Sequence, residues 1–182
     1  MTNRNLLIEF IQNYQSVYQE EQIFKISFLE LLSHPRAFYR DHLPGHITAS
    51  SWIIDPRGKF ALLTHHKKLN RWLQPGGHAD GEEDALAVAE KEALEETGLS
   101  SLQWIFPQIF DMDIHSIPAR TDFPQHLHYD IRFLFHASKE EPFTVSHESK
   151  DLAWVQEQDL AGKTGNNASI LRMAEKVRAI LN

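Results

Sequence analysis

The 182-residue chain contains no cysteine. This absence excludes disulfide bonds, thiolate metal sites and a cysteine nucleophile, and it fits a reducing compartment. The chain also has no apolar run of about 20 residues and no basic segment followed by an apolar one. We therefore expect no membrane span and no signal peptide, and we expect a cytoplasmic protein.

The chain also has fewer basic than acidic residues. Lys and Arg number 18 against 25 Asp and Glu, so the formal net charge is -7. A surface for nucleic acid or anionic membrane needs the opposite sign, and neither partner is expected. Bound cations could still reverse the field locally at a metal site. The length and apolar content are those of a folded main domain with its own hydrophobic core.

Helical periodicity begins near the N-terminus. Apolar residues at helical spacing predict helices over 3–15, capped by Asn3 or Asn5, and over 20–33. The second helix is expected to end at His34-Pro35, because proline disfavours a helical conformation in the residue before it.

A turn signal at Pro44-Gly45 separates these helices from the rest. We place there the boundary between an N-terminal helical extension, residues 1–45, and a main domain, residues 46–182. The extension could be a packing layer, a homodimer surface or a lid that shapes the substrate site.

The main domain mixes strands and helices. Short runs rich in β-branched, aromatic and aliphatic residues, bounded by turn residues, predict strands at 46–54, 59–64, 103–115, 127–136 and 151–155. An acidic helix is predicted over about 82–97, closed by Gly98, and a terminal helix over 167–181. This order predicts an α/β (α+β) fold, a sandwich with a mixed β-sheet.

The acidic helix carries three glutamates on one face. Glu92, Glu95 and Glu96 are three and four positions apart, the spacing of neighbours on a helix surface. Their charges repel, and they lie near the helix C-terminus, where the dipole disfavours anions. A hard cation such as Mg²⁺ or Mn²⁺ would remove both penalties. On this feature alone, a solvated acidic face is the favoured interpretation, because runs of charged residues usually face solvent.

A glycine pair precedes the helix. Gly76 and Gly77 permit unusual dihedral angles and a close approach of the backbone. A carbonyl group there could complete a metal shell, and nearby N–H groups could face phosphate oxygens.

The spacing of the whole stretch resembles the Nudix box, the signature of the Nudix hydrolase family. It runs Gly77, five residues, Glu83, seven residues, then Lys91-Glu92-Ala93-Leu94-Glu95-Glu96-Thr97-Gly98-Leu99. Chance agreement at all these positions is on the order of one in a million. The lead-in from Trp72 to His78 is similar to that of the family as well. The resemblance implies a Nudix-type α/β/α sandwich from about residue 46 onward, with residues 1–45 outside it.

The resemblance also implies an activity and roles. Family members mostly hydrolyse a diphosphate linkage in a nucleoside diphosphate derivative, with Mg²⁺ or Mn²⁺. By the match, Glu92, Glu95 and Glu96 would bind metal together with the carbonyl group of Gly77, and Glu92 would also accept the proton of the attacking water. Glu148, in a later loop, is a candidate for a further acidic ligand or an ordinary exposed residue.

One position departs from the family pattern. Lys91 stands where the family has an arginine that pairs with the first glutamate of the box, here Glu83. Lysine keeps the positive charge but loses the planar bidentate fork. We expect a looser catalytic loop and an uncertain role for Glu83, with no metal ligand removed.

Two later strands carry alternating polar residues. These are Asp111, Asp113 and His115 on the first, and His126, His128 and Asp130 on the second. If the strands pair around the 116–126 loop, they form one cluster. The cluster could line the substrate pocket, hold a further metal, or be the wet face of a sheet. Trp72, Gly76, Gly77 and His78 are the other candidate substrate contacts, with base stacking on Trp72 weighed against core packing.

Two alternatives share this pattern. A Nudix-like sensing module would bind a nucleotide without cleaving it, but it could lose one of the three glutamates, and all are present. Isopentenyl diphosphate isomerase resembles this architecture, but its usual chemistry relies on a cysteine. We therefore expect a Nudix-type pyrophosphohydrolase that acts on a small nucleotide-derived substrate.

Overall fold

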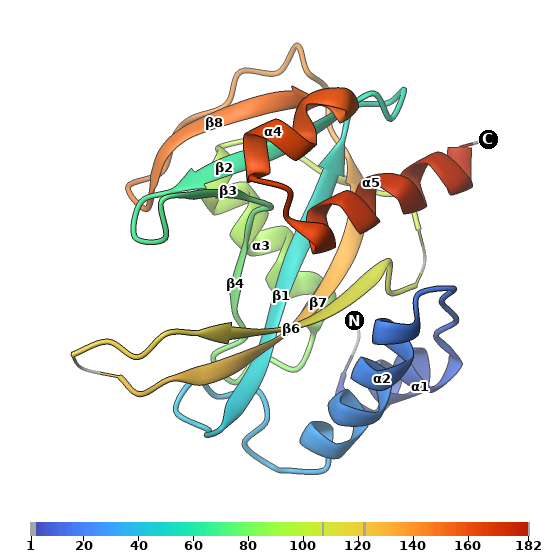
Figure 1. Cartoon of the computed structure of the whole chain (residues 1–182), viewed down its shortest axis with the longest axis vertical. Coiled ribbons are helices and arrows are strands. Elements are labelled where there is room, and N and C mark those ends of the chain that lie inside the picture. The colour runs from blue at the N-terminus through green and yellow to red at the C-terminus, as the bar shows by residue number, and fades with distance from the viewer. Residues whose placement is uncertain (1–2, 107, 122, 182) are drawn as a thin grey trace. The chain divides into compact units, whose positions relative to one another are not determined.

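The computed structural model describes residues 3–106, 108–121 and 123–181 (Figure 1). The helices are α1 (Arg4–Asn13), α2 (Gln19–Leu32), α3 (Ala85–Thr97), α4 (Leu160–Thr164) and α5 (Ala168–Leu181), with a 3₁₀ turn at Glu157–Asp159. The strands are β1 (Gly45–Ile54), β2 (Phe60–His66), β3 (Arg71–Leu73), β4 (Gly76–His78), β5 (Gln103–Trp104), β6 (Asp111–Ile117), β7 (His126–His136) and β8 (Ser149–Gln156). Among these helices, none has the length and apolar character needed to cross a membrane.

Hydrogen bonds join the strands into one sheet. Its order is β3-β2-β1-β7-β5, with β4 beside β1, β6 beside β7 and β8 beside β2. The predicted α+β class with a mixed sheet and N-terminal helices is confirmed. The chain forms two compact units: Met1–Ser50 with Gly77–Ala89 and Gln108–Phe133, and Ser51–Gly76 with Glu90–Pro107 and Leu134–Asn182.

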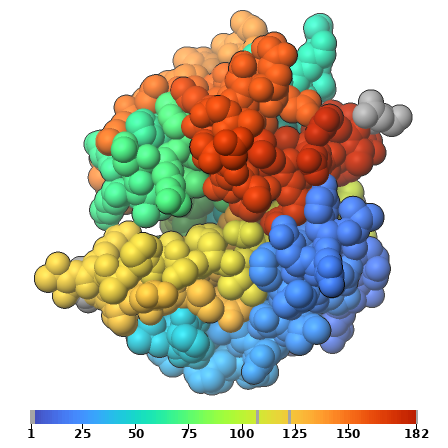
Figure 2. Space-filling model, in the orientation of Figure 1, coloured from blue at the N-terminus to red at the C-terminus, as the bar shows by residue number. Residues whose placement is uncertain are grey.

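In the first unit, α1 and α2 form a helical pair. The side chain of Asn3 accepts a hydrogen bond from the N–H of Leu6 at 3.0 Å, which confirms one of the two predicted caps. Leu7 and Ile11 are fully buried on the inner face of α1. The two helices pack on each other, and α2 packs against β6, where blue and yellow surfaces meet in Figure 2. The apolar periodicity of the sequence thus identified a packing face.

A buried carboxylate anchors α2. Glu21 is fully buried, and its carboxylate accepts hydrogen bonds from the hydroxyl groups of Tyr14 (2.7 Å) and Ser16 and from the backbone N–H of Met112 in β6 (3.1 Å). An ionised carboxylate in the interior is tolerated only when its oxygens are satisfied in this way. Glu21 therefore ties the helical pair to the edge of the sheet.

We expect Glu21→Gln to lower the free energy of unfolding by about 2 kcal/mol, because the amide turns one acceptor into a donor that faces another donor. Urea denaturation measures the change. Glu9→Gln, on an exposed position of α1, is the matched control and should stay within about 0.5 kcal/mol of wild type. Equal effects of the two substitutions would contradict the anchoring role.

A second buried ionic group lies in the β6–β7 hairpin. The strands pair antiparallel, with Asp113 opposite Asp130. The guanidinium group of Arg132, 2% exposed, lies 3.0 Å from Asp111, 3.2 Å from Asp113 and 2.8 Å from Asp130. Burial alone lowers the pKa of Arg132, but the three carboxylates outweigh it and raise that pKa overall. The aspartates are therefore structural partners of an arginine, not residues of a wet sheet face.

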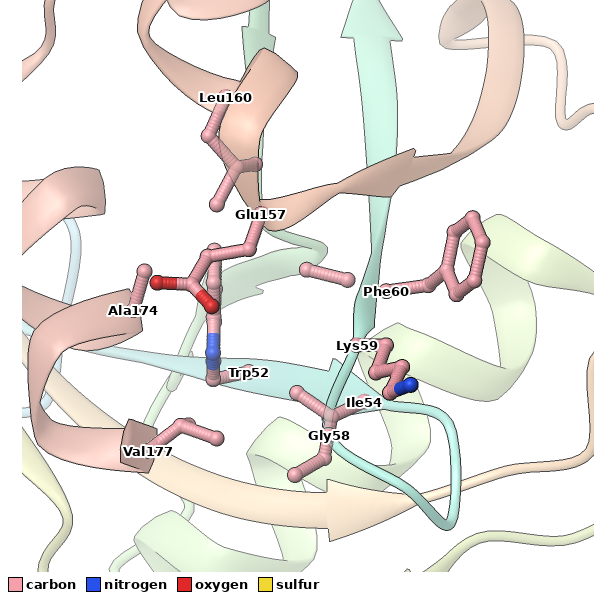
Figure 3. A pocket seen from close by; sticks show the side chains of 10 residues that line it. Trp52, Ile54, Gly58, Lys59, Phe60, Glu157, Leu160, Ala174 and Val177 are labelled. Carbon is pink, nitrogen blue, oxygen red and sulfur yellow. The ribbon is translucent and has the colours of Figure 1, made fainter. Parts of the chain in front are cut away.

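In the second unit, β2 is the central strand. It pairs antiparallel with β1, β3 and β8. Buried residues of α5 include Ile170, Met173 and Val177. Figure 3 shows Val177 and Ala174 beside a small apolar pocket that has room for about one water molecule. The pocket is a packing gap of the core, because it is too small for a nucleotide.

Three local predictions were wrong in detail. The acidic helix begins at Ala85 rather than residue 82, because the Asp84 side chain accepts the N–H of Ala87 at 3.1 Å and caps it. The predicted 103–115 strand is split into β5 and β6. Gly76 and Gly77 lie in the short strand β4, and the positive φ angles fall just after it, at Asp80 (49°) and Gly81 (93°).

Candidate active site

The C-terminal end of α3 is held in place by a close backbone approach. Gly98 has a φ of +68°, and a Cβ there would lie 2.8 Å from the Cβ of Thr144. The N–H of Thr144 donates to the carbonyl of Thr97 at 2.7 Å. Glycine is therefore required both for the left-handed conformation and for the space. The last turn of α3, which carries the glutamates, is fixed by this contact.

Glu96 is the buried member of the acidic group. Glu96 is 7% exposed. Burial, followed by repulsion from Glu92 and Glu148, raises the pKa of Glu96 to about 8, although a hydrogen bond from the backbone of Gly76 lowers it. Within the part of the chain that the structure describes, Oε2 of Glu96 is buried and has no hydrogen-bond partner. A buried acceptor left in this state is costly.

The other glutamates lie closer to solvent. The side chain of Glu92 is 24% exposed and that of Glu95 is 61% exposed. Lys91 lies 3.9 Å from Glu92 and 3.8 Å from Glu95, so it offsets part of their charge. Glu95 is therefore the most solvated of the three predicted ligands.

The loop glutamate is brought to the helix. The backbone carbonyl of Glu148 accepts the N–H of Lys67 at 3.0 Å, just before β8. The Glu148 side chain is 53% exposed, yet it is close enough to raise the pKa of Glu96. The structure thus gathers Glu92, Glu96 and Glu148 into one group, although Glu148 is 52 positions beyond Glu96 in the chain.

The donor set fits a hard divalent cation. It consists of carboxylate oxygens, the ligands that Mg²⁺ and Mn²⁺ prefer. A cation among them would satisfy the unpartnered Oε2 of Glu96 and cancel the repulsion that raises its pKa. Lys91 offsets the charge of Glu92 and Glu95.

The raised pKa of Glu96 has a consequence for stability. When a chelator removes metal ions, Glu96 keeps a proton in the folded state that it releases in the unfolded state. The free energy of unfolding should therefore fall as the pH rises from about 5 to about 8. The Glu96 contribution to this fall should be roughly 2 to 4 kcal/mol. Urea denaturation across this pH range measures it.

Two comparisons isolate Glu96 in that experiment. Glu96→Gln should flatten the slope, since the amide does not titrate, and saturating Mg²⁺ should flatten it in the wild type. Glu90→Gln, on the same helix, should keep the slope. An unchanged slope in Glu96→Gln would show that Glu96 titrates normally.

The first glutamate of the box has a partner from the N-terminal extension. The guanidinium group of Arg4 lies 2.8 Å from Glu83 and also donates to the carbonyls of His34 (3.2 Å) and Pro35 (3.0 Å). Its charge also lies over the ring of Phe38. Arg4 was not among the predicted site residues, because nothing near it in the sequence points to Glu83.

We expect Arg4→Ala to cost about 2 kcal/mol of folding free energy, since it removes hydrogen bonds from a charged donor to two carbonyl groups. Arg4→Lys should recover less than half, because one ammonium group does not reproduce the planar fork. A double-mutant cycle with Glu83→Gln should assign no more than about 1 kcal/mol to the ion pair, whose carboxylate is 42% exposed. Full rescue by lysine would contradict this account.

The predicted base-stacking residue already has neighbours. The ring of Trp72 stacks on that of His65, with centroids 4.9 Å apart, and Nζ of Lys163 lies 3.8 Å from the Trp72 centroid. Together they occupy ring surface that a stacked base would use. Trp72 is thus neither a core residue nor an open platform.

The predicted strand residues form a histidine cluster. His115 lies opposite His128 in the β6–β7 register, as expected if the strands pair, and its Nδ1 is 3.1 Å from Asp113. Nε2 of His126 is 3.3 Å from Nε2 of His128. His78, from β4, lies against His128 with ring centroids 4.9 Å apart.

A residue that the sequence analysis missed completes this cluster. His46, at the start of β1, is 1% exposed, and its ring centroid lies 5.3 Å from that of His78 and 5.1 Å from that of His128. Burial lowers the pKa of His46 and of His78 to about 4, and that of His128 to about 2. The only local signal is the preceding Gly45, whose missing side chain allows β1 to come close to β7.

Comparisons with known proteins agree with this architecture. The family model described as NUDIX domain matches residues 44–174, and the chain therefore belongs to the Nudix family. The predictions of this family and of a Nudix-type pyrophosphohydrolase are confirmed at that level. A search of curated proteins gave no match.

Several solved structures share the fold. An Ap4A hydrolase of C. elegans has a TM-score of 0.59 and 21% identity, over 74% of this chain and 96% of its own. A MutT protein of Methanosarcina mazei has a TM-score of 0.57 and 18% identity, over 75% and 95%. A Nudix hydrolase of M. smegmatis, RenU, has a TM-score of 0.56 and 21% identity, over 76% and 89%. At these identities the likeness concerns the fold.

Proposed function

We propose that the chain hydrolyses the diphosphate linkage of a nucleoside diphosphate derivative in the presence of Mg²⁺ or Mn²⁺. The observation that carries the proposal is the buried Glu96 carboxylate, with one unpartnered oxygen and a pKa raised to about 8 beside Glu92 and Glu148. Such a group is expensive unless a cation joins it, and perturbed carboxylates of this kind are typical of functional sites.

The proposed ligands are Glu92, Glu95, Glu96, Glu148 and the carbonyl oxygen of Gly77. Among them, Glu96 is the least solvated and Glu95 the most. Membership of the Nudix family supports the assignment of Gly77, Glu92, Glu95 and Glu96, because these residues match the metal-ligand positions of the box. Glu148 lies outside the box, and its assignment is supported by its effect on the pKa of Glu96. When bound, the cations would polarise the diphosphate oxygens and lower the pKa of a bound water.

The protein residues then have separate tasks. Glu92, half-buried and held 3.9 Å from Lys91, would accept the proton of the attacking water at a carboxylate oxygen. Lys91 would offset part of the negative charge of Glu92. The backbone N–H of Gly76 orients Glu96 through the hydrogen bond it donates. Glu83, paired with Arg4, would hold the loop before α3.

The substrate can be narrowed only to a class. The proteins of similar fold include an Ap4A hydrolase, so dinucleoside polyphosphates are the first substrates to test. Nucleoside triphosphates are tested beside them. Nucleotide sugars, ADP-ribose and CDP-alcohols contain the same linkage and complete the panel. The neighbours of Trp72 favour substrates whose recognition does not depend on stacking against its ring.

The test is a turnover assay over this panel with Mg²⁺ and with Mn²⁺, in which chromatography separates each substrate from its nucleotide products. Nucleoside triphosphates would in addition release phosphate or pyrophosphate. Glu96→Gln should lower kcat on the best substrate by about 100-fold or more, since it removes charge stabilisation in the transition state. Glu90→Gln, elsewhere on α3, should keep the wild-type rate.

The outcomes separate the two candidate functions. Turnover that is lost in Glu96→Gln supports the hydrolase. Binding of a nucleotide without turnover on any panel member would overturn it in favour of the sensing module. Turnover that Glu96→Gln leaves intact would place catalysis elsewhere.

A further inference from the structure

The histidine cluster of the first unit contains a set of three ring nitrogens that lie close together. His46 from β1, His78 from β4 and His128 from β7 each offer one ring nitrogen, and these atoms all lie within 4.8 Å of one another. The three rings come from segments far apart in the sequence. His46 and His128 have no role in the hydrolysis proposed above, and neither is among its proposed metal ligands.

One ring of this set, that of His46, has a buried acceptor without a partner among the described residues. Nδ1 of His46 faces the carbonyl of His42 at 3.5 Å, so the ring proton is assigned to Nδ1 and the lone pair to Nε2. Nε2 is buried and has no hydrogen-bond partner among the described residues. Since the residue is 1% exposed, bulk water does not compensate this lone pair.

The hydrogen bonds of His126 determine which nitrogen of His128 carries the lone pair. Nδ1 of His126 donates to the carbonyl of Pro124 at 2.9 Å, which leaves its Nε2 as an acceptor. Nε2 of His128 then donates across the 3.3 Å contact, and the lone pair of His128 resides on Nδ1. Metal-binding histidines are usually oriented in this way by a partner at the other ring nitrogen.

The surroundings fit a cation rather than an anion. The rings of His46 and His128 are neutral at neutral pH, so they present lone pairs and no positive charge. Arg40, whose charge acts on His46 and His78, is engaged with Asp80 through two nitrogens. A phosphate group would therefore find few charged donors here, while a metal ion would find three neutral imidazoles.

The chain itself brings the first histidine to the others. A Cβ on Gly45 would lie 2.7 Å from the carbonyl oxygen of Leu127, so only glycine allows β1 to start against β7. The N–H of Leu127 also donates to the carbonyl of Pro44 at 2.8 Å. His46 is the next residue, and its ring stacks on that of His126 with centroids 5.1 Å apart.

We propose that His46, His78 and His128 form a site for a borderline-soft divalent transition metal, represented by Zn²⁺, with ligands other than the carboxylates proposed above. Three imidazoles suit such a metal, whereas Mg²⁺ selects oxygen ligands. With Zn–N distances of about 2.0 Å, a tetrahedron needs nitrogens about 3.3 Å apart, so rotation of the side chains must close the triangle from at most 4.8 Å. Three protein ligands leave one position open for water or for a substrate group.

The test is metal binding by the full-length protein without a histidine tag, stripped with a chelator and kept in excess Mg²⁺. Co²⁺ is the probe, because a nitrogen site of low coordination number gives strong visible absorption. We expect one equivalent of Co²⁺ per chain with such bands, displaced by Zn²⁺. His78→Gln and His128→Gln should each weaken Co²⁺ binding by about 100-fold or more, beyond the effect of losing an outer partner.

Matched variants locate the ion. His147→Gln, at a side chain that is 92% exposed, and Glu92→Gln, at the carboxylate site, should leave Co²⁺ binding unchanged. Loss of binding in Glu92→Gln, or unchanged binding in the two cluster variants, would overturn the proposal. The readout does not depend on turnover, so failure of the proposed hydrolysis would not be confused with it.

A measurement on the wild type covers the case in which a buried-histidine variant does not fold. Imidazole nitrogen resonances of the ¹⁵N-labelled protein, recorded with Mg²⁺ alone and with added Zn²⁺, should shift for three rings and leave the exposed ring of His147 unchanged. No shift, or shifts confined to histidines outside the cluster, would contradict the site.

Discussion

The burial of Glu96 is the constraint on which the functional part of the structure depends. Its carboxylate has one oxygen held by the backbone of Gly76 and the other without a partner, with Glu92 and Glu148 close enough to raise its pKa to about 8. Three elements must converge to create this situation: α3, β4 and the loop before β8. A fold that holds like charges together, at a cost in stability, is preorganised for a cation, because the ligands then need little rearrangement when the cation binds.

The histidine cluster of the first unit offers a different kind of donor atom. There the acceptors are imidazole nitrogens, neutral through burial, and the unpartnered atom is Nε2 of His46. Oxygen and nitrogen donor sets select different metals, so the two proposed sites need not compete for the same ion. The N-terminal helices contribute by contacts of their own, since Glu21 bonds to β6 and Arg4 pairs with Glu83. A role of the extension in packing therefore has direct contacts to support it.

Much of the candidate site could be predicted from the sequence alone. Glu92, Glu95 and Glu96 lie on one helix, and a helical period of 3.6 residues fixes which of them are neighbours without any tertiary information. Gly98 as the end of that helix was predicted on equally local grounds. The sequence suggested that the two later strands would form one polar cluster if they paired, but the register that sets His115 opposite His128 came from the structure. The least accurate predictions concerned short elements such as β4, where three residues give too little periodicity to distinguish a strand from a turn.

By itself, the sequence determined the family and the acidic face of α3, because both are encoded in the spacing of residues along one segment. Only the tertiary structure decided that Glu96 is buried while Glu95 is solvated, that Arg4 is the partner of Glu83, and that His46 joins a histidine cluster. These facts depend on strand register and on close backbone approach between segments separated by tens of residues. Such contacts leave no periodic trace in the sequence, since either partner alone looks like an ordinary charged or polar residue.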